Sequence, residues 1–159
     1  MDVPADSCAM LDRVACSGAV ERAWVQLIRA HRSALCHVEK ALRAADLPPL
    51  EWYDVLLELE RGGPLRPRDL QDRLLFAQYN LSRLLDRMEA ADMVTRERCS
   101  DDARCQWVSA TEAGEAMRQR MWPVYAGAIR AALGERLTEA QAEKLADLLG
   151  KLSNCPKAG

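Results

Sequence analysis

The sequence predicts a mainly α-helical fold (α+β) with a single β-hairpin. Two patterns lead to this prediction: apolar residues recur at helical spacing over long stretches, and only one short region alternates as paired strands do. The composition agrees, because aromatic residues make up only 5% of the 159 residues while alanine, leucine and arginine are abundant. With 49% apolar and 29% charged residues, the composition is that of an ordinary globular domain.

A long first helix is predicted over residues 18–45. Its apolar positions recur every three or four residues and are Val20, Trp24, Leu27, Ile28, Leu35, Val38 and Leu42. Leu47-Pro48-Pro49 must end this helix, because proline cannot continue it and restricts the residue before it. A second helix is expected over residues 51–60. Residues 1–17 show no strong periodicity and are expected to form a flexible N-terminal arm.

Two shorter helices are predicted next, close together in the sequence. Pro67 suits a first helical turn, which predicts a helix over residues 68–75. After a tight turn at residues 76–78, a fourth helix is expected up to about Ala91. Its apolar back consists of Leu81, Leu84, Leu85 and Met88, and its polar front or leading end of Gln78, Tyr79, Asn80, Ser82 and Arg83. Such a helix pair is typical of a helix-turn-helix.

A β-hairpin and two further helices complete the predicted fold. The strands are expected over residues 94–99 and 105–110 around a charged turn, in a register that places Glu97 opposite Trp107 and Thr95 opposite Ser109. A helix from Thr111 to about Leu133 is expected to follow. The last helix begins at a Thr138–Gln141 capping box and is expected to bury Leu145, Leu148, Leu149 and Leu152.

The charge distribution points to nucleic acid only locally. The net charge of -2 gives no global footprint of a nucleic-acid-binding protein, but residues 61–87 contain six arginines against three aspartates. Short polar groups and arginine on a helix can read base edges in the major groove. A hairpin tip with Arg104 can enter the minor groove, with Asp102 orienting the arginine, although Asp101-Asp102 is also readily explained as a solvated turn.

Several other classes of protein are disfavoured. The N-terminus lacks the basic and apolar regions of an export signal and no apolar run is long enough to cross a bilayer, so a cytoplasmic location without membrane association is expected. We find no nucleophile–base set, phosphate-binding loop or paired carboxylates, and therefore expect neither enzymatic activity nor a cofactor. The six cysteines contain no C-x-x-C spacing, which weakens a structural zinc site.

The order of motifs from about residue 20 onward resembles the MarR family of transcription regulators. The resemblance lies in Leu84-Leu85-Asp86-Arg87-Met88-Glu89-Ala90-Ala91-Asp92-Met93-Val94, then Arg96, Asp102-Ala103-Arg104 and Ser109-Ala110-Thr111-Glu112-Ala113-Gly114, with Leu50-Glu51-Trp52-Tyr53-Asp54-Val55-Leu56 upstream. Asp92 replaces the family's glycine, which is tolerable because aspartate visits the left-handed conformation that such a cap requires. Ala77 and Tyr79 replace its usual serines, so helix capping and base contacts there should differ.

The resemblance implies a winged helix-turn-helix over residues 49–111 and a helical dimerisation region over residues 18–48 and 112–155. It further implies a homodimer on a pseudo-palindromic duplex DNA operator. We therefore expect a sequence-specific regulator of repressor type, with DNA contacts from Gln78, Tyr79, Asn80, Ser82, Arg83, Asp102 and Arg104. The alternative of a winged-helix module that binds only proteins is disfavoured by the arginines of the fourth helix and hairpin.

The signal that controls such a regulator is open between three sites. A pocket for a small aromatic or phenolic ligand could be lined by Trp24, His31, Trp52, Tyr53 and Arg87; the alternative is that the aromatic residues are core and Arg87 pairs with an acid. Cys99 and Cys105 face each other in the predicted register and could form a redox-active pair, or be unrelated. Metal binding by Cys36, His37 and His31 is the least favoured, because these residues do not share one helix face.

Overall fold

The structure is a computed structural model that describes residues 16–74, 80–98 and 106–153. The chain divides into two units, one ending at Cys36 and the other beginning at His37. The described residues begin at Cys16, so the N-terminal arm expected over residues 1–17 lies almost entirely outside them. In the described part, no helix is long and apolar enough to span a bilayer.

Helix α2 covers Gly18–Ala44, close to the predicted range, and α3 covers Leu50–Gly62, a little longer than predicted. Asp46 ends α2 in the left-handed conformation with a φ of 53°. The Asp46 and Leu47 amides donate to the carbonyls of Arg43 and Leu42, which makes this end a Schellman motif. The Glu39 carboxylate then accepts the Leu50 amide at 3.0 Å, so a side chain of α2 satisfies the start of α3.

The helix-turn-helix pair consists of α4 (Pro67–Arg73) and α5 (Leu81–Ala90). Pro67 occupies the first turn of α4 as predicted, since its missing N–H has no helical partner there. Helix α4 ends at Arg73, two residues before its predicted end. The predicted turn at residues 76–78 and the contacts predicted for Gln78 and Tyr79 lie outside the described residues.

The wing is an antiparallel hairpin of β1 (Val94–Arg98) and β2 (Gln106–Ala110). Its register places Glu97 opposite Trp107 and Thr95 opposite Ser109, which confirms the predicted pairing. Leu65 adds a β-bridge on the other edge of β2, exchanging two backbone hydrogen bonds of 3.0 and 2.8 Å with Val108. Sequence analysis missed this bridge because a single bridging residue leaves no alternating pattern.

Two helices follow the wing: α6 (Glu112–Ile129), which continues as the π-helical turn η1 (Arg130–Gly134), and α7 (Glu139–Gly150). The predicted Thr138–Gln141 capping box is present at the start of α7. The expectation that α7 buries its leucines is wrong for the isolated chain, because Leu148, Leu149 and Leu152 are 51%, 36% and 65% exposed.

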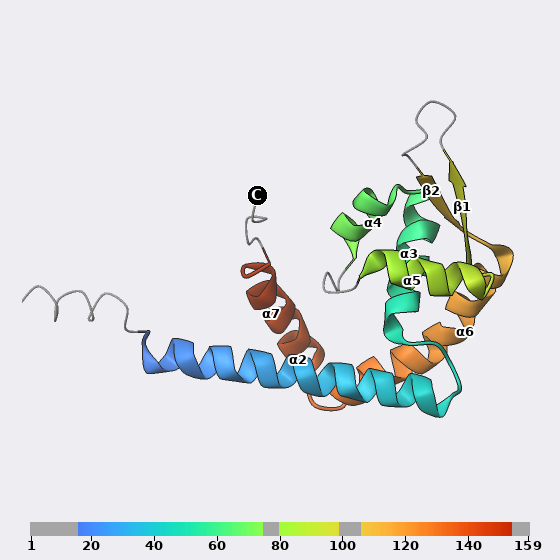
Figure 1. Ribbon diagram of the computed structural model, residues 1–159. Coiled ribbons are helices and arrows are strands. Elements are labelled where there is room, and N and C mark those ends of the chain that lie inside the picture. The colour runs from blue at the N-terminus through green and yellow to red at the C-terminus, as the bar shows by residue number, and fades with distance from the viewer. Residues whose placement is uncertain (1–15, 75–79, 99–105, 154–159) are drawn as a thin grey trace, which may run out of the picture. The chain divides into compact units, whose positions relative to one another are not determined.

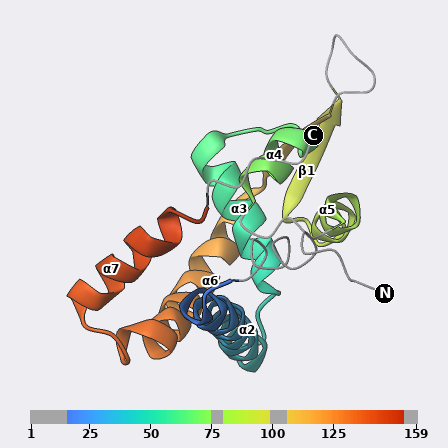
Figure 2. The same ribbon diagram turned by 90° about the vertical axis from the view of Figure 1, so that its left-hand side faces the viewer.

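The core of the second unit lies where α3, α4, α5 and the two strands meet. It consists of Val55, Leu56, Leu59, Leu65, Leu70, Leu81, Leu84, Leu85, Met88, Val94 and Val108. Figure 1 shows α5 beside the base of the β1–β2 hairpin, and Figure 2, which looks along α5, shows the same neighbourhood with β1. The buried residues therefore hold the second helix of the helix-turn-helix against the wing.

Candidate nucleic-acid interface

Helix α5 has the two-sided character that a DNA-reading helix requires. Leu84, Leu85 and Met88 on its back are at most 1% exposed and lie in the core. Ser82 and Arg83 on the opposite side are exposed. The apolar side fixes α5 to the core of the second unit, and the exposed side leaves hydroxyl and guanidinium groups available to a ligand.

Asn80 is the N-cap of α5. Its side-chain oxygen accepts the Arg83 backbone amide at 3.3 Å, which satisfies one of the free donors of the first turn. The cap that sequence analysis expected to differ, given Ala77 and Tyr79, is thus supplied by an asparagine. Because the cap uses only the oxygen, the Asn80 amide group retains its two N–H donors.

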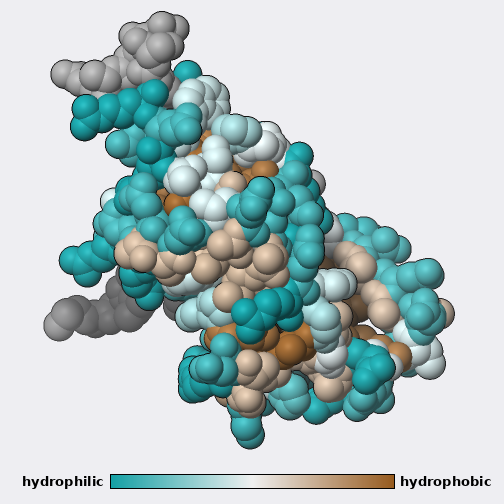
Figure 3. All heavy atoms as spheres, turned by 90° about the vertical axis from the view of Figure 1, so that its right-hand side faces the viewer, coloured by the Kyte–Doolittle hydropathy of each residue, from teal (hydrophilic) through white to brown (hydrophobic). Residues whose placement is uncertain are grey.

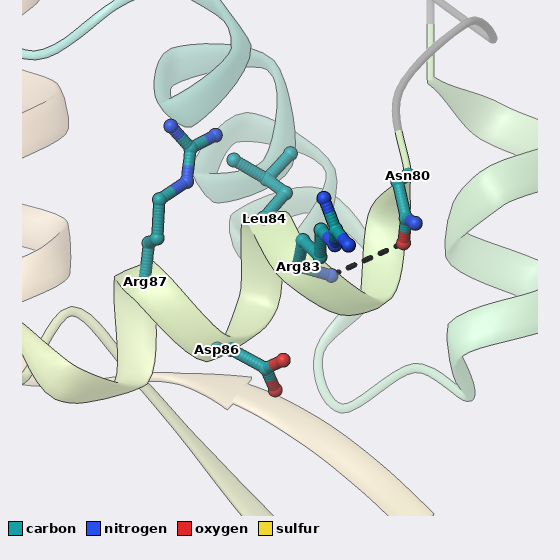
Figure 4. Close-up of a pocket in the computed structure, with 5 residues that line it drawn as sticks. All are labelled: Asn80, Arg83, Leu84, Asp86 and Arg87. Atoms are coloured by element: carbon teal, nitrogen blue, oxygen red, sulfur yellow. Dashed lines mark hydrogen bonds between the residues drawn. The ribbon is translucent and has the colours of Figure 1, made fainter.

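An open hollow runs along α5 and is lined by Asn80, Arg83, Leu84, Asp86 and Arg87. Figure 4 shows Arg87 and Asp86 pointing to different sides of the helix. The Arg87 guanidinium pairs with Glu51 in the first turn of α3. Arg83 makes no ion pair with any residue in the described part of the chain, so its charge is available to an anion such as a DNA phosphate or to a base edge.

Arg96 of β1 connects the wing to α5. Its guanidinium donates to Glu89 at 2.9 and 2.6 Å and to Asp86 at 2.6 Å. The hydrogen bonds with Glu89 and then with Asp86 raise the pKa of Arg96 above its ordinary value, because they favour the charged form. Arg96 is therefore a permanent cation held between two carboxylates.

Arg66 lies over Trp107, with its guanidinium carbon 5.2 Å from the ring centroid. Arg66 is the N-cap of α4 and Trp107 belongs to β2, so this cation–π contact joins the first helix of the pair to the wing. Both side chains are exposed, which adds another cation to the surface of the lobe.

The end of α5 is tied to the start of α6. Asp92 has a φ of 60°, which confirms the left-handed cap predicted for this aspartate. The Asp92 and Met93 amides donate to the carbonyls of Glu89 and Met88, forming a second Schellman motif. Thr111 caps α6: its hydroxyl donates to the Asp92 carbonyl at 2.6 Å and accepts the Gly114 amide at 3.0 Å.

The residues proposed for a small-molecule pocket lie in different surroundings. Tyr53 is 5% exposed and contacts Trp122 and Tyr125, with ring centroids 6.1 and 5.0 Å away. Trp52 packs against the core, and its buried indole N–H has no hydrogen-bond partner in the described part of the chain. Tyr53 is thus a core residue and Arg87 pairs with an acid, as the alternative interpretation had it. Trp24 and His31 are exposed residues of the first unit.

The cysteines and histidines add little to the described site. Cys16 and Cys36 are free and exposed. Among residues 16–74, 80–98 and 106–153, no group of three histidine, cysteine or acidic side chains could hold a metal ion. Cys99 and Cys105, and the proposed wing contacts Asp102 and Arg104, lie outside the described residues.

The sequence pattern allowed an acidic partner for Arg87 without identifying it, and it gave no partner for Arg96. Glu51 and Glu89 were not considered as partners of arginine, although one signal for Arg96 was available. Strand alternation places Arg96 on the same face as Val94, which is buried. A charged residue at such a position requires a partner, and Asp86 and Glu89 are one helical turn apart on the neighbouring helix.

Comparison with known proteins gives a consistent family. A family model described as MarR family matches residues 45–104. An uncharacterized HTH-type transcriptional regulator of Bacillus cereus is 27% identical over 129 residues, covering 81% of this chain and 85% of that protein. Sco3205, a MarR family transcriptional regulator from Streptomyces coelicolor solved in complex with DNA, matches with a TM-score of 0.79 and 25% identity over 90% of this chain and 92% of its own.

A second solved structure shares the fold at lower identity. BpsR of Bordetella bronchiseptica, whose DNA binding is regulated by 6-hydroxynicotinic acid, matches with a TM-score of 0.74 and 21% identity over 82% of this chain and 92% of its own. These similarities, together with the helix-turn-helix and the two-stranded wing, agree with the family expected from the sequence. This chain is thus similar to the MarR family of winged helix-turn-helix transcription regulators, in sequence over residues 45–104 and in fold over most of its length.

Proposed function

We propose that the protein is a homodimeric repressor that binds a pseudo-palindromic operator through α5 and the wing. The proposed contacts are Gln78, Tyr79, Asn80, Ser82, Arg83, Asp102 and Arg104. Arg83 carries the proposal, because it is an exposed cation without an acidic partner among the described residues, on a helix whose opposite side is core. Base edges or phosphates are the groups that such an arginine satisfies best.

The dimer is supported by apolar side chains that each unit leaves uncovered. The part of α2 that belongs to the first unit, residues 18–36, has no buried residue. Within it, Trp24 and Ile28 are 63% and 40% exposed. In the second unit, Trp122, Ile129 and Leu133 are exposed in addition to the α7 leucines. Figure 3 shows hydrophobic side chains reaching the surface between hydrophilic ones. We assign residues 18–48 and 112–155 to dimerisation with a second copy, which would bury such surface.

The DNA-binding proposal is tested with the arginine on α5. The probe is a duplex recovered by selecting genomic fragments of the source organism with the purified protein, labelled and titrated by fluorescence anisotropy. Arg83→Ala should weaken binding by about 1–3 kcal/mol, the range for a lost base contact. Arg120→Ala removes the same charge from an exposed position of α6, outside the winged helix-turn-helix of residues 49–111. Its affinity for the duplex should stay within about twofold of the wild-type value. Equal affinities of both variants would reject the proposal that the side of α5 with Arg83 contacts DNA.

For the controlling signal, we propose a small aromatic or phenolic acid. Arg87 could exchange Glu51 for a ligand carboxylate, and the neighbouring residue Trp52 has an indole N–H with no hydrogen-bond partner among the described residues. The regulation of BpsR by 6-hydroxynicotinic acid is consistent with this class of ligand. The test is release of the labelled duplex on titration with hydroxylated aromatic acids. Release by mild peroxide instead would favour the alternative, a thiol sensor at Cys99 and Cys105.

A further inference from the structure

The reading helix and the wing are connected by one arginine and two acids. Arg96 is on β1, and its side chain is 19% exposed; Asp86 and Glu89 are on α5, and their side chains are 57% and 41% exposed. The guanidinium bonds both carboxylates at once, with its terminal nitrogen 2.6 Å from an oxygen of each. Because Asp86 and Glu89 are three residues apart, they are neighbours on the surface of α5.

Attachment at two points constrains α5 more than one contact does. A single ion pair would allow the helix to rotate about its axis or slide along it, whereas two acceptors on successive turns resist both movements. The planar fork of arginine suits this task, since its donors keep fixed directions. Asp86 also lines the hollow that contains Arg83, so the anchored side of α5 adjoins its proposed reading side.

Stability alone does not explain this arrangement. Ion pairs whose acids are this exposed add little to the stability of a folded protein, because solvent screens them. They can still select one orientation among several that the apolar core permits, because Leu84, Leu85 and Met88 pack without directional bonds.

We propose that Arg96 is a positioning residue for DNA recognition, which sets the angle between α5 and β1 so that the reading helix and the wing fit one duplex together. The inference rests on the DNA-binding function proposed above. We call the ion pairs of Arg96 with Asp86 and Glu89 the anchor. Loss of the anchor leaves the other surface charges in place but lets α5 and β1 move independently. Binding to DNA of any sequence then persists, whereas discrimination between sequences falls.

The chain supplies a matched control. Arg118 of α6 pairs with Glu60 of α3 through two contacts of 2.7 and 2.6 Å, and its side chain is 16% exposed. Arg118 and Arg96 thus have the same charge, a similar exposure and a double contact to a neighbouring helix. The Arg118 pair, however, joins two helices that include neither α5 nor the wing.

The experiment compares Arg96→Met and Arg118→Met in the full-length protein. The probes are the duplex selected by the wild-type protein and a scrambled duplex of the same length and composition. The measured quantity is the dissociation constant for the scrambled duplex divided by that for the selected duplex. This ratio cancels the loss of one positive charge, which weakens binding to both duplexes. We expect Arg96→Met to lower this ratio about tenfold, equivalent to one base contact, and Arg118→Met to change it less than twofold.

Folding and function are separated by further variants. If Arg96→Met does not fold, the double variant Asp86→Ala, Glu89→Ala removes the anchor from the other side and is expected to lower the ratio similarly. Arg96→Lys retains the charge but not the fork, and should fall between wild type and Arg96→Met. An unchanged ratio in the folded anchor variants, or an equal loss in Arg118→Met, would overturn the inference. A wild-type protein that does not discriminate between the duplexes would instead overturn the proposed function.

Discussion

Gly114, in the first turn of α6, is a site where one methyl group should destabilise the fold. A Cβ atom at this position would lie 2.1 Å from the Met93 carbonyl oxygen and 2.9 Å from Leu56 Cδ2. The oxygen cannot easily move away, because it accepts the Thr111 amide at 3.1 Å beside the end of α5. Gly114→Ala therefore forces either α6 or the α5–β1 junction to shift.

The magnitude follows from three opposing effects. Alanine gains up to about 1 kcal/mol over glycine in a helix interior. Overpacking of a filled site costs about 1–3 kcal/mol, and here the obstacle is backbone, which favours the upper end. Loss of the Thr111–Met93 hydrogen bond adds about 1 kcal/mol. The net expectation is a loss of about 2–3 kcal/mol in the free energy of unfolding.

Gly127 provides the control on the same helix. A Cβ atom there has no neighbour within 4 Å, so Gly127→Ala should stabilise the chain by up to about 1 kcal/mol. Urea unfolding followed by far-UV circular dichroism measures both, at equal protein concentration because a dimer's stability depends on it. A Gly114→Ala protein as stable as wild type would refute the close approach at Met93.

Three further predictions concern the helix cap, an aromatic cluster and the dimer. Asp92→Gly should raise the free energy of unfolding by about 1 kcal/mol in urea titrations, because glycine adopts the φ of 60° without strain; an unchanged midpoint would contradict this. Burial, and after it the charges of Tyr53 and Asp54, raise the pKa of Tyr125, so the free energy of unfolding should be constant below pH 10 and fall as pH rises above it. Tyr125→Phe should reduce this fall in unfolding measured against pH, and a profile identical to that of the wild type would contradict the prediction. Leu148→Glu should produce monomers in sedimentation velocity while Ala146→Glu, off the leucine side of α7, does not; dimers in both would argue for another interface.

Local signals in the sequence were enough to predict the elements and several of their ends. The left-handed Asp92, the capping box at Thr138 and the pairing of Glu97 with Trp107 all follow from interactions within a few residues or within one hairpin. The exposed and buried sides of α5 were predicted for the same reason, since helical periodicity alone separates Arg83 from Leu84 and Leu85.

Interactions between elements were not predictable in the same way. The pairs Arg87–Glu51 and Arg96–Glu89 depend on how α3, α5 and β1 pack, which the spacing of apolar residues leaves open. The apolar side of α7 was assigned to a core, but periodicity cannot tell whether a helix packs within its own chain or against another. The placement of Tyr53 beside Trp122 and Tyr125 likewise required the tertiary structure.

The most direct test of sequence-specific DNA binding is a salt titration of the wild-type protein on its selected duplex and on the scrambled one. Each phosphate neutralised should contribute about −0.9 to the slope of log K against log salt concentration, so several contacts predict a steep decline on both duplexes. At physiological salt the selected duplex should bind at least about a thousandfold more tightly. Equal affinity for the two duplexes, or binding that does not depend on salt, would contradict the account.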